Sequence, residues 1–252
     1  MTQHTEKPMI IEITGPSGSG KTTYLQKLLS ILEEKGESTG AIHSPELNKS
    51  ADIPVVFSDL SRHNISTDLL AFPWALLFFS RNPFFVIFCL LRIFRLDESP
   101  KQKISVLRSF LRKVGIRRFL TRSKFKHVRI VVDEGLCHSA HNFLMSTRFH
   151  AKEVVIEKFT SLCPLPDAIV ILTAPAQILA DRLKQRGDLS PRIIRGRDTL
   201  SFCENAYLLY QHVAGAWNGL SQCVVINSHL TNEKEALALG FSVLPGNKCD
   251  SL

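Results

Sequence analysis

Short runs of apolar residues alternate along the chain with longer stretches whose apolar positions have helical spacing. Five short runs are typical of buried strands, at 9–14, 39–43, 128–133, 167–173 and 223–227. Apolar residues recur every three or four positions in stretches that predict helices, at 21–35, 138–163, 176–186, 200–217 and 232–239. Strands that alternate with helices predict an α/β fold with a parallel sheet covered on both faces.

The connection between the second and third expected strands is too long to be a simple loop, and its pattern is mostly helical. We therefore expect residues 51–127 to form a helical insertion. The chain has 252 residues, which suits one domain that carries such an insertion. This domain is expected to span residues 1–243, with a lid at about 187–198 and a loose tail at 244–252.

Residues 69–96 are strongly apolar and raise the question of a membrane span. A spanning helix needs about 20 apolar residues. Arg81 divides this stretch, and Pro73 and Pro83 punctuate it. We therefore expect short helices that lie flat on a surface or pack internally, and no span.

The charge of the chain is concentrated in one segment. The chain has 31 Lys and Arg against 23 Asp and Glu. Between Ser99 and Val132 there are eleven bases and no acid, so the remainder has 20 bases against 23 acids. The bases in this segment are Lys101, Lys103, Arg108, Arg112, Lys113, Arg117, Arg118, Arg122, Lys124, Lys126 and Arg129.

Three interpretations of this apolar and basic insertion stay open. Its helices can pack against each other as a lid with solvated bases. They can lie on an anionic membrane through residues 69–129 and reach a lipid-linked acceptor. They can also bind an anionic acceptor or nucleic acid, although no nucleic-acid motif accompanies the charge. Six scattered cysteines and a polar stretch at 1–8 favour a cytoplasmic protein without a signal peptide, with the inner face of the membrane as an alternative location.

A glycine-rich turn joins the first expected strand to the first helix. The sequence Gly15-Pro-Ser-Gly-Ser-Gly-Lys-Thr22 matches the Walker A pattern G-x-x-x-x-G-K-[ST] without a mismatch. Its glycines allow backbone N–H groups to surround a phosphate chain, and the following helix directs its positive end at the same anion. We expect a P-loop for ATP and Mg²⁺, with Lys21 on the β- and γ-phosphates and Thr22 on the metal. The nucleotide-binding residues expected here are Gly15, Ser17, Gly18, Ser19, Gly20, Lys21, Thr22 and Thr23.

Two adjacent carboxylates, Asp133 and Glu134, stand at the end of the third expected strand. A P-loop NTPase places its second metal-holding acid at this point, so Asp133 is expected to hold Mg²⁺ together with Thr22. Glu134 is expected to face the acceptor as a general base. The alternative is an acid that caps the following helix, which is common at strand-to-helix turns.

Arginines gather after the fourth strand and its helix. A kinase needs positive charge that closes over the phosphates and excludes water. Arg192, Arg195 and Arg197 follow a hinge at Gly187, and we expect them to form a catalytic lid. A solvated charge cluster is the alternative.

These motifs resemble those of P-loop nucleoside and nucleotide kinases, nearest to the thymidylate-kinase-like group. The matching segments are 15–23, 133–142, 171–174, 180–187 and 224–227. The resemblance implies a P-loop NTPase fold with a five-stranded parallel sheet in the order 2-3-1-4-5. It also implies that ATP is the phosphoryl donor and that adenine lies near Arg182, Arg186 and Asn227.

One position departs from the thymidylate type, which has Asp-Arg-Tyr at the third-strand turn and uses the arginine to grip the acceptor phosphate. This chain has Asp133-Glu134-Gly135. A carboxylate repels a phosphate but can take the proton of a hydroxyl, as a glutamate does in the same region of deoxynucleoside kinases. The acceptor therefore stays open between a nucleotide, a nucleoside and a sugar or glycan hydroxyl.

Two function classes follow from the sequence. The first is an ATP-dependent kinase, a phosphotransferase that passes the γ-phosphoryl group to a small-molecule or glycan acceptor. The second is a P-loop ATPase at a membrane surface that acts as a regulator or assembly factor. The arginine-rich lid favours the first class, whereas ATP hydrolysis without an acceptor would favour the second.

Overall fold

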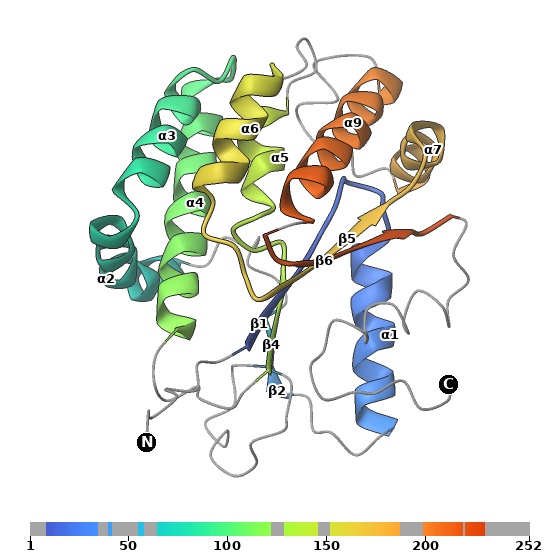
Figure 1. Cartoon of the computed structure of the whole chain (residues 1–252), viewed down its shortest axis with the longest axis horizontal. Coiled ribbons are helices and arrows are strands. Elements are labelled where there is room, and N and C mark those ends of the chain that lie inside the picture. The colour runs from blue at the N-terminus through green and yellow to red at the C-terminus, as the bar shows by residue number, and fades with distance from the viewer. Residues whose placement is uncertain are drawn as a thin grey trace.

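The computed structural model describes residues 9–34, 40–41, 55–57, 65–121, 129–145, 152–186, 199–218 and 220–229. In this part of the chain, six parallel strands form one sheet with helices on both faces (Figure 1). The sheet order is β2-β3-β4-β1-β5-β6. The strands are β1 (Met9–Thr14), β2 (Gly40–Ala41), β3 (Val55–Phe57), β4 (Arg129–Asp133), β5 (Ala168–Thr173) and β6 (Gln222–Asn227).

The expected count of five strands is wrong, because β3 adds a sixth. It lies inside the segment expected to be a helical insertion, and it pairs with β2 on one side and β4 on the other. Three residues are too few to reveal a strand by periodicity. When β3 is left out, the other five strands follow one another in the expected order.

The helices mostly begin and end where the sequence pattern predicts. The expected helix over 138–163 is instead two helices, because the backbone turns extended at Met145. The expected helix at 232–239, the lid at 187–198 and the tail at 244–252 lie outside the described residues. The described helices are α1 (Lys21–Glu34), α2 (Ile65–Arg81), α3 (Pro83–Phe94), α4 (Pro100–Leu120), α5 (Ser139–Leu144), α6 (Glu153–Leu162), α7 (Ala176–Arg186) and α9 (Thr199–Trp217).

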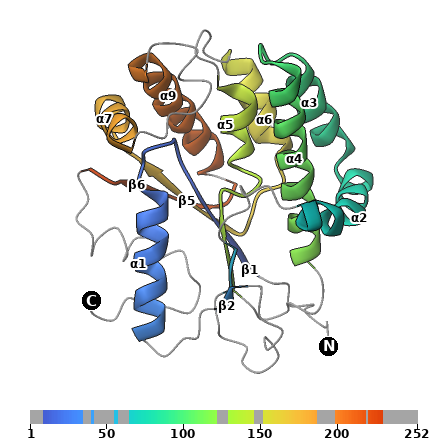
Figure 2. The same cartoon turned by 180° about the vertical axis from the view of Figure 1, so that it is seen from behind.

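Alternate residues of the central strands pack into opposite layers, as the pleat requires. Ile11 and Ile13 of β1 belong to a cluster with the apolar face of α1. Ile10 belongs to a cluster on the other face with Leu120 at the end of α4. Figures 1 and 2 show α1 apart from the large helical layer that contains α3, α4, α5, α6 and α9.

Helices α2 and α4 pack closely along most of their length. A Cβ atom added at Gly115 of α4 would lie 2.2 Å from the carbonyl oxygen of Ala71, so only glycine allows this approach. Asp68 at the start of α2 forms ion pairs with Arg108 and Arg112 of α4. Burial favours a higher pKa for Asp68, but the hydrogen bonds and charges of the two arginines lower the pKa overall. The contact between the two helices is therefore both steric and electrostatic.

The prediction that Pro73 breaks the apolar segment is wrong, because Pro73 lies inside α2. A proline removes one backbone N–H, and Pro73 is exposed, so water can reach the carbonyl group that loses its partner. In the described part of the chain, no single helix is both long and apolar enough to cross a membrane. Residues from Asp68 to the end of α2 pass that test only together with α3, and the two helices are bent by 114° where they meet.

Candidate functional site

The loop between β1 and α1 has a backbone that depends on glycine. Gly15 and Gly18 have φ angles of 150° and 84°, in a region that L side chains rarely adopt. A Cβ atom would lie 2.1 Å from the carbonyl oxygen of Leu172 at Gly15 and 2.9 Å from that of Leu179 at Gly18. Gly15, Ser17, Gly18, Ser19, Gly20, Lys21, Thr22 and Thr23 thus lie together in one loop and the first turn of α1.

Lys21, the first residue of α1, is buried, and its ammonium group turns back onto the loop. Its Nζ atom donates hydrogen bonds to the carbonyl oxygens of Gly15 and Pro16, each at 3.0 Å. The same atom lies 3.3 Å from Oε1 of Glu134. The two side chains that the sequence assigned to phosphate and acceptor are therefore direct partners. Thr22 and Thr23 are exposed to solvent in the same turn.

Parallel pairing of β1 with β4 brings the two carboxylates to the glycine-rich loop. Asp133 lies opposite Ile13, two residues before Gly15, and the N–H of Glu134 donates to the Ile13 carbonyl oxygen at 3.1 Å. Glu134 has a φ angle of 53°, in the left-handed region that costs a non-glycine residue about 1 kcal/mol or more. The strained turn is thus held by the sheet and directs the Glu134 side chain towards Lys21.

The two carboxylates differ in their surroundings. Burial, reinforced by the neighbouring Glu134, raises the pKa of Asp133 to about 6. One oxygen of Asp133, Oδ1, is buried without a hydrogen-bond partner in the described part of the chain. Burial also favours a higher pKa for Glu134, but the charges of Lys21 and Lys113 outweigh it and lower the pKa overall.

Lys113 of α4 is a residue of this site that the sequence interpretation had assigned to a basic surface. Its side chain is only 5% exposed, and Glu134, Glu12 and Asp133 act on its charge. Burial lowers the pKa of Lys113, and these three carboxylates oppose the shift. Among the described residues, the structure gives its ammonium no hydrogen bond or close ion pair. Lys113 is therefore a buried lysine that faces an acidic cluster without touching it.

Glu12, in the middle of β1, is buried and holds the turn that follows β4. Its two carboxylate oxygens accept hydrogen bonds from the backbone N–H groups of Cys137 and His138, at 3.0 and 2.9 Å. Burial raises the pKa of Glu12 despite these hydrogen bonds. The sequence contained a signal for this role, because Glu12 is the one acid in the apolar run 9–14.

A buried group of polar side chains lies beside Glu134. Nε2 of His138 lies 3.6 Å from Oε2 of Glu134. Nδ1 of the same ring lies 3.3 Å from Oγ1 of Thr14 and 3.1 Å from the Tyr210 hydroxyl group, which comes from α9. His141 stacks on the His138 ring at a centroid distance of 5.3 Å. None of these contacts follows a motif, so the sequence interpretation missed them.

Arg182 of α7 connects the glycine-rich loop to the end of β6. Its Nη1 atom donates to the Gly18 carbonyl oxygen at 3.2 Å and to the Ser228 hydroxyl group at 3.0 Å. Asn227, the last residue of β6, accepts a hydrogen bond from the His229 N–H through its side chain. Arg186 is exposed one turn further along α7. Arg182 is thus bonded to the loop itself, and Asn227 adjoins Ser228, the second partner of Arg182.

The remaining predicted site residues, Arg192, Arg195 and Arg197, lie outside the described residues. In the described part of the chain, no group of three or more His, Cys, Asp or Glu side chains is arranged to hold a metal ion. No protein-family model matches the chain, and no curated protein is similar to it in sequence. The functional assignment therefore rests on the arrangement of the residues.

Proposed function

We propose that the chain is an ATP-dependent P-loop kinase that transfers the γ-phosphoryl group to a hydroxyl of a small-molecule acceptor. One observation carries the proposal. The glycine-dependent loop enters α1 directly at Lys21, and Lys21 contacts a carboxylate at the end of the neighbouring strand. A positive helix end, a buried cation and an adjacent carboxylate are the groups that phosphoryl transfer from a nucleotide needs.

In this proposal the loop and Lys21 bind the triphosphate. The backbone N–H groups of the loop and of the first turn of α1 attract anionic oxygens, because the positive end of the helix lies there. Lys21 exchanges the carbonyl oxygens of Gly15 and Pro16 for phosphate oxygens when the nucleotide binds. The exchange is local, because Lys21 already lies at the mouth of the loop.

Thr22 and Asp133 are the residues proposed to hold Mg²⁺. This metal keeps much of its water and takes only one or two protein oxygens beside those of the phosphates. The unpartnered Oδ1 of Asp133 fits such a role, directly or through water. When bound, the ion neutralises negative charge on the transferred group.

Glu134 is proposed to accept the proton of the acceptor hydroxyl. Lys21 and Lys113 keep the carboxylate ionised, and His138 restricts its orientation. Lys113 has no close partner among the described residues, so it is available to orient a polar or anionic group of the acceptor. This arrangement favours a sugar, nucleoside or other hydroxyl acceptor over a simple phosphate, because three carboxylates lie nearby.

A second candidate function is a P-loop ATPase that works at a membrane surface as a regulator or assembly factor. The exposed apolar residues of α2 and α3 favour it, because soluble kinases have no need of such a surface. ATP hydrolysis that is unaffected by any acceptor would support this alternative.

The first test is nucleotide binding by the wild-type protein and two variants. A non-hydrolysable ATP analogue with Mg²⁺ should raise the melting temperature of the wild type, because the ligand binds only the native state. Lys21→Ala should remove most of this increase without changing the melting temperature of the free protein by more than a few degrees. Lys184→Ala, an exposed lysine on α7, is the control and should respond like the wild type.

A panel of nucleosides, nucleotides and sugars, added with the analogue, should then identify the acceptor by a further increase in melting temperature. An accepted compound should gain one phosphoryl group when ATP replaces the analogue. If no nucleotide stabilises the wild-type protein, the proposed function is wrong.

A further inference from the structure

Helices α2 and α3 expose large apolar side chains on their outer faces. In α3, Phe84, Ile87, Leu91 and Phe94 follow one stripe of the helix, and each is at least 51% exposed. Helix α2 adds a second exposed group. The nine members of this surface, which we term the α2–α3 face, are Leu69, Leu70, Phe72, Leu76, Leu77, Phe84, Ile87, Leu91 and Phe94.

The outward direction of the α2–α3 face is fixed by packing on the other side of both helices. Ala75 and Phe78 of α2 are buried in the main core, together with Phe85 and Cys89 of α3. The close approach of α2 to α4 at Gly115 leaves no freedom to turn α2 around. In Figures 1 and 2, α2 and α3 form the outer edge of the helical layer, far from α1. The apolar residues are therefore presented to the exterior by a rigid scaffold.

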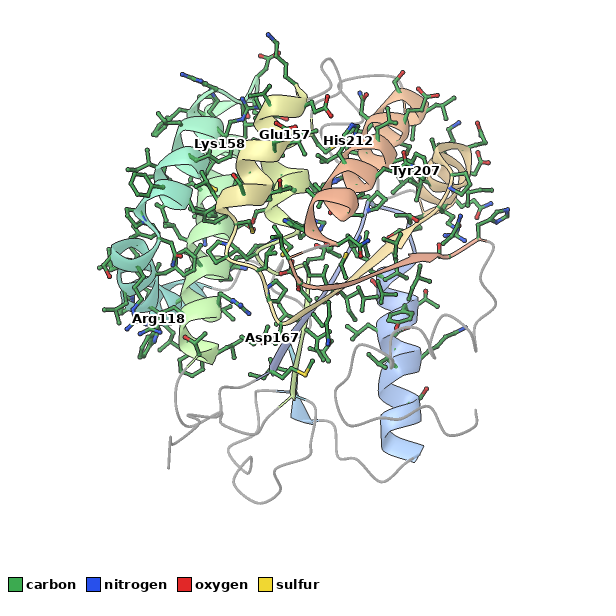
Figure 3. The ribbon with its side chains drawn as sticks, viewed as in Figure 1. Arg118, Glu157, Lys158, Asp167, Tyr207 and His212 are labelled. Atoms are coloured by element: carbon green, nitrogen blue, oxygen red, sulfur yellow. The ribbon has the colours of Figure 1, made fainter. Side chains whose placement is uncertain are left out.

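Three exposed bases stand at the ends of the helices that form or adjoin this face, with the exposed Asp97 between two of them in the sequence. Residues 69–121 contain ten Lys and Arg and two Asp and Glu, so the rest of the chain is balanced, with 31 − 10 = 21 bases and 23 − 2 = 21 acids. Arg81 is exposed at the end of α2, Arg95 follows α3, and Lys101 is exposed at the start of α4. Figure 3 shows Arg118 of α4 beside α2. Burial lowers the pKa of Arg118, and the positive charge of Arg81 lowers it further.

We propose that the α2–α3 face docks the protein on an anionic phospholipid surface. An apolar stripe with a basic rim lies in the interfacial plane of a bilayer, with the apolar side chains among the acyl chains and the bases at the head groups. The 114° bend between the helices suits a pair that lies in this plane. Docking does not depend on the nucleotide chemistry proposed above.

The observations favour lipid over a protein partner. A second copy of the chain would bring two faces of the same positive charge together, which opposes association. A protein partner would need acidic groups placed opposite Arg81, Arg95 and Lys101, whereas an anionic lipid surface supplies negative charge without a specific fit.

The structure also changes which bases meet the lipid. Arg112 and Lys113 belong to the most basic stretch of the sequence, but they are only 3% and 5% exposed. Arg112 is paired with Asp68, and Lys113 faces the carboxylate cluster. Neutralising these two residues would disturb the fold or the site, so the docking test uses Arg95 and Lys101 instead.

The experiment is co-sedimentation of the full chain with two kinds of vesicle, one of phosphatidylcholine alone and one of equal parts phosphatidylcholine and phosphatidylserine. The wild type should sediment with the mixed vesicles only, and raised ionic strength should weaken this binding. Phe84→Gln/Leu91→Gln should lower the affinity by at least about 100-fold, because two large apolar side chains no longer leave water. Val154→Gln/Leu220→Gln removes two equally exposed apolar side chains elsewhere and should bind normally.

The charge is tested with a second pair of double variants. Each base near an anionic surface contributes about 1 kcal/mol to binding. Arg95→Gln/Lys101→Gln should therefore lower the affinity by about 30-fold. Lys152→Gln/Lys158→Gln removes two exposed bases, one just before α6 and one within it, and should have no effect. Figure 3 labels Lys158 on α6. All four variants change exposed side chains, and their melting temperatures report whether they fold.

Three results would overturn the proposal. The protein can remain in the supernatant with both vesicles. It can bind both vesicles equally, without dependence on salt or on Arg95 and Lys101. It can form a concentration-dependent dimer that Phe84→Gln/Leu91→Gln abolishes, in which case the face joins two copies of the chain and not lipid.

Discussion

Two regions of the molecule reverse the usual placement of charged and apolar residues. One is the end of the sheet that holds the glycine-rich loop, and the other is the α2–α3 face. Glu12, Lys21 and Lys113 have ionisable side chains but are at most 7% exposed, whereas Leu70 and Phe84 are apolar but at least 74% exposed. Soluble proteins place such residues the other way round unless a partner compensates. At the loop the compensation is mutual, because cations face carboxylates. At the α2–α3 face the described residues supply no cover, which marks it as a contact surface.

The largest expected loss of activity follows from removing the carboxylate that faces Lys21. Glu134→Gln keeps the size and backbone of the residue but cannot accept a proton. We expect kcat to fall by roughly 10²- to 10⁴-fold, with little change in ATP affinity. Glu157→Gln, at an exposed position on α6, is the control. An equal loss of ATP binding would instead make Glu134 a ligand for the metal or a structural residue.

The next change tests whether Lys113 belongs to the site or only to the core. Lys113→Met has a similar volume and carries no charge. We expect kcat to fall by roughly 10²-fold with unchanged ATP affinity, because the acceptor loses a positioning contact. Stability should stay the same or increase, since an ammonium without a close partner is costly to bury. Lys101→Met, exposed on the same helix, should change neither quantity, and an unchanged kcat in Lys113→Met would assign Lys113 to the core alone.

The scaffold that orients the α2–α3 face is tested by two glycine-to-alanine variants on helices. Gly115→Ala should destabilise the protein by about 1–3 kcal/mol, because its Cβ atom collides with the α2 backbone. Gly215→Ala on α9 has no atom within 4 Å of the added carbon and should stabilise by about 0.5–1 kcal/mol. Chemical denaturation measures both. If Gly115→Ala is neutral, α2 is free to shift and the face is not rigid.

The smallest expected effect concerns acid stability through Asp68. The folded state lowers the pKa of this carboxyl group, so its ion pairs stabilise the protein above the unfolded pKa of about 4 and lose their effect as the pH falls through the folded value. The difference in stability between the wild type and Asp68→Asn should be about 1 kcal/mol or less at neutral pH, because the asparagine oxygen can still accept a hydrogen bond from Arg112 and because Arg108 is partly exposed. It should shrink towards zero in strong acid. A difference that does not vary with pH would show that the ion pairs contribute nothing.

The fold was largely predictable because its strands and helices have strong local patterns. The bounds of β1 and α7 agree with the sequence pattern, because an apolar run and a helical repeat can each be recognised from a few neighbouring residues. The strand β3 was missed because it has three residues and gains its place only by pairing with β2 and β4. The proline in α2 misled the prediction because Pro73 is exposed, so water can solvate the carbonyl group that loses its partner.

The candidate site was predictable only where one motif carried it. The loop from Gly15 to Thr23 and the carboxylates at the end of β4 could be located from the sequence, because a motif of fixed spacing marks the first and the end of an apolar run marks the second. The polar group around His138 could not, because Tyr210 lies 196 residues from Thr14 and 72 from His138. Lys113 was misassigned for the same reason, since a lysine on a basic helix gives no sign that its side chain points inward.

The two tryptophans of the chain divide between the main core and α2, which gives each of these parts its own intrinsic fluorophore. Trp217 is fully buried in α9, where its indole N–H donates to the Thr160 carbonyl oxygen at 3.4 Å. Trp74 is half-buried on α2 and contacts the Phe119 ring edge-on at 5.7 Å. A Trp74→Phe variant would emit from the core alone, and a Trp217→Phe variant from α2 alone. Emission from Trp74 should then shift to shorter wavelength when α2 enters a less polar medium, while emission from Trp217 stays constant.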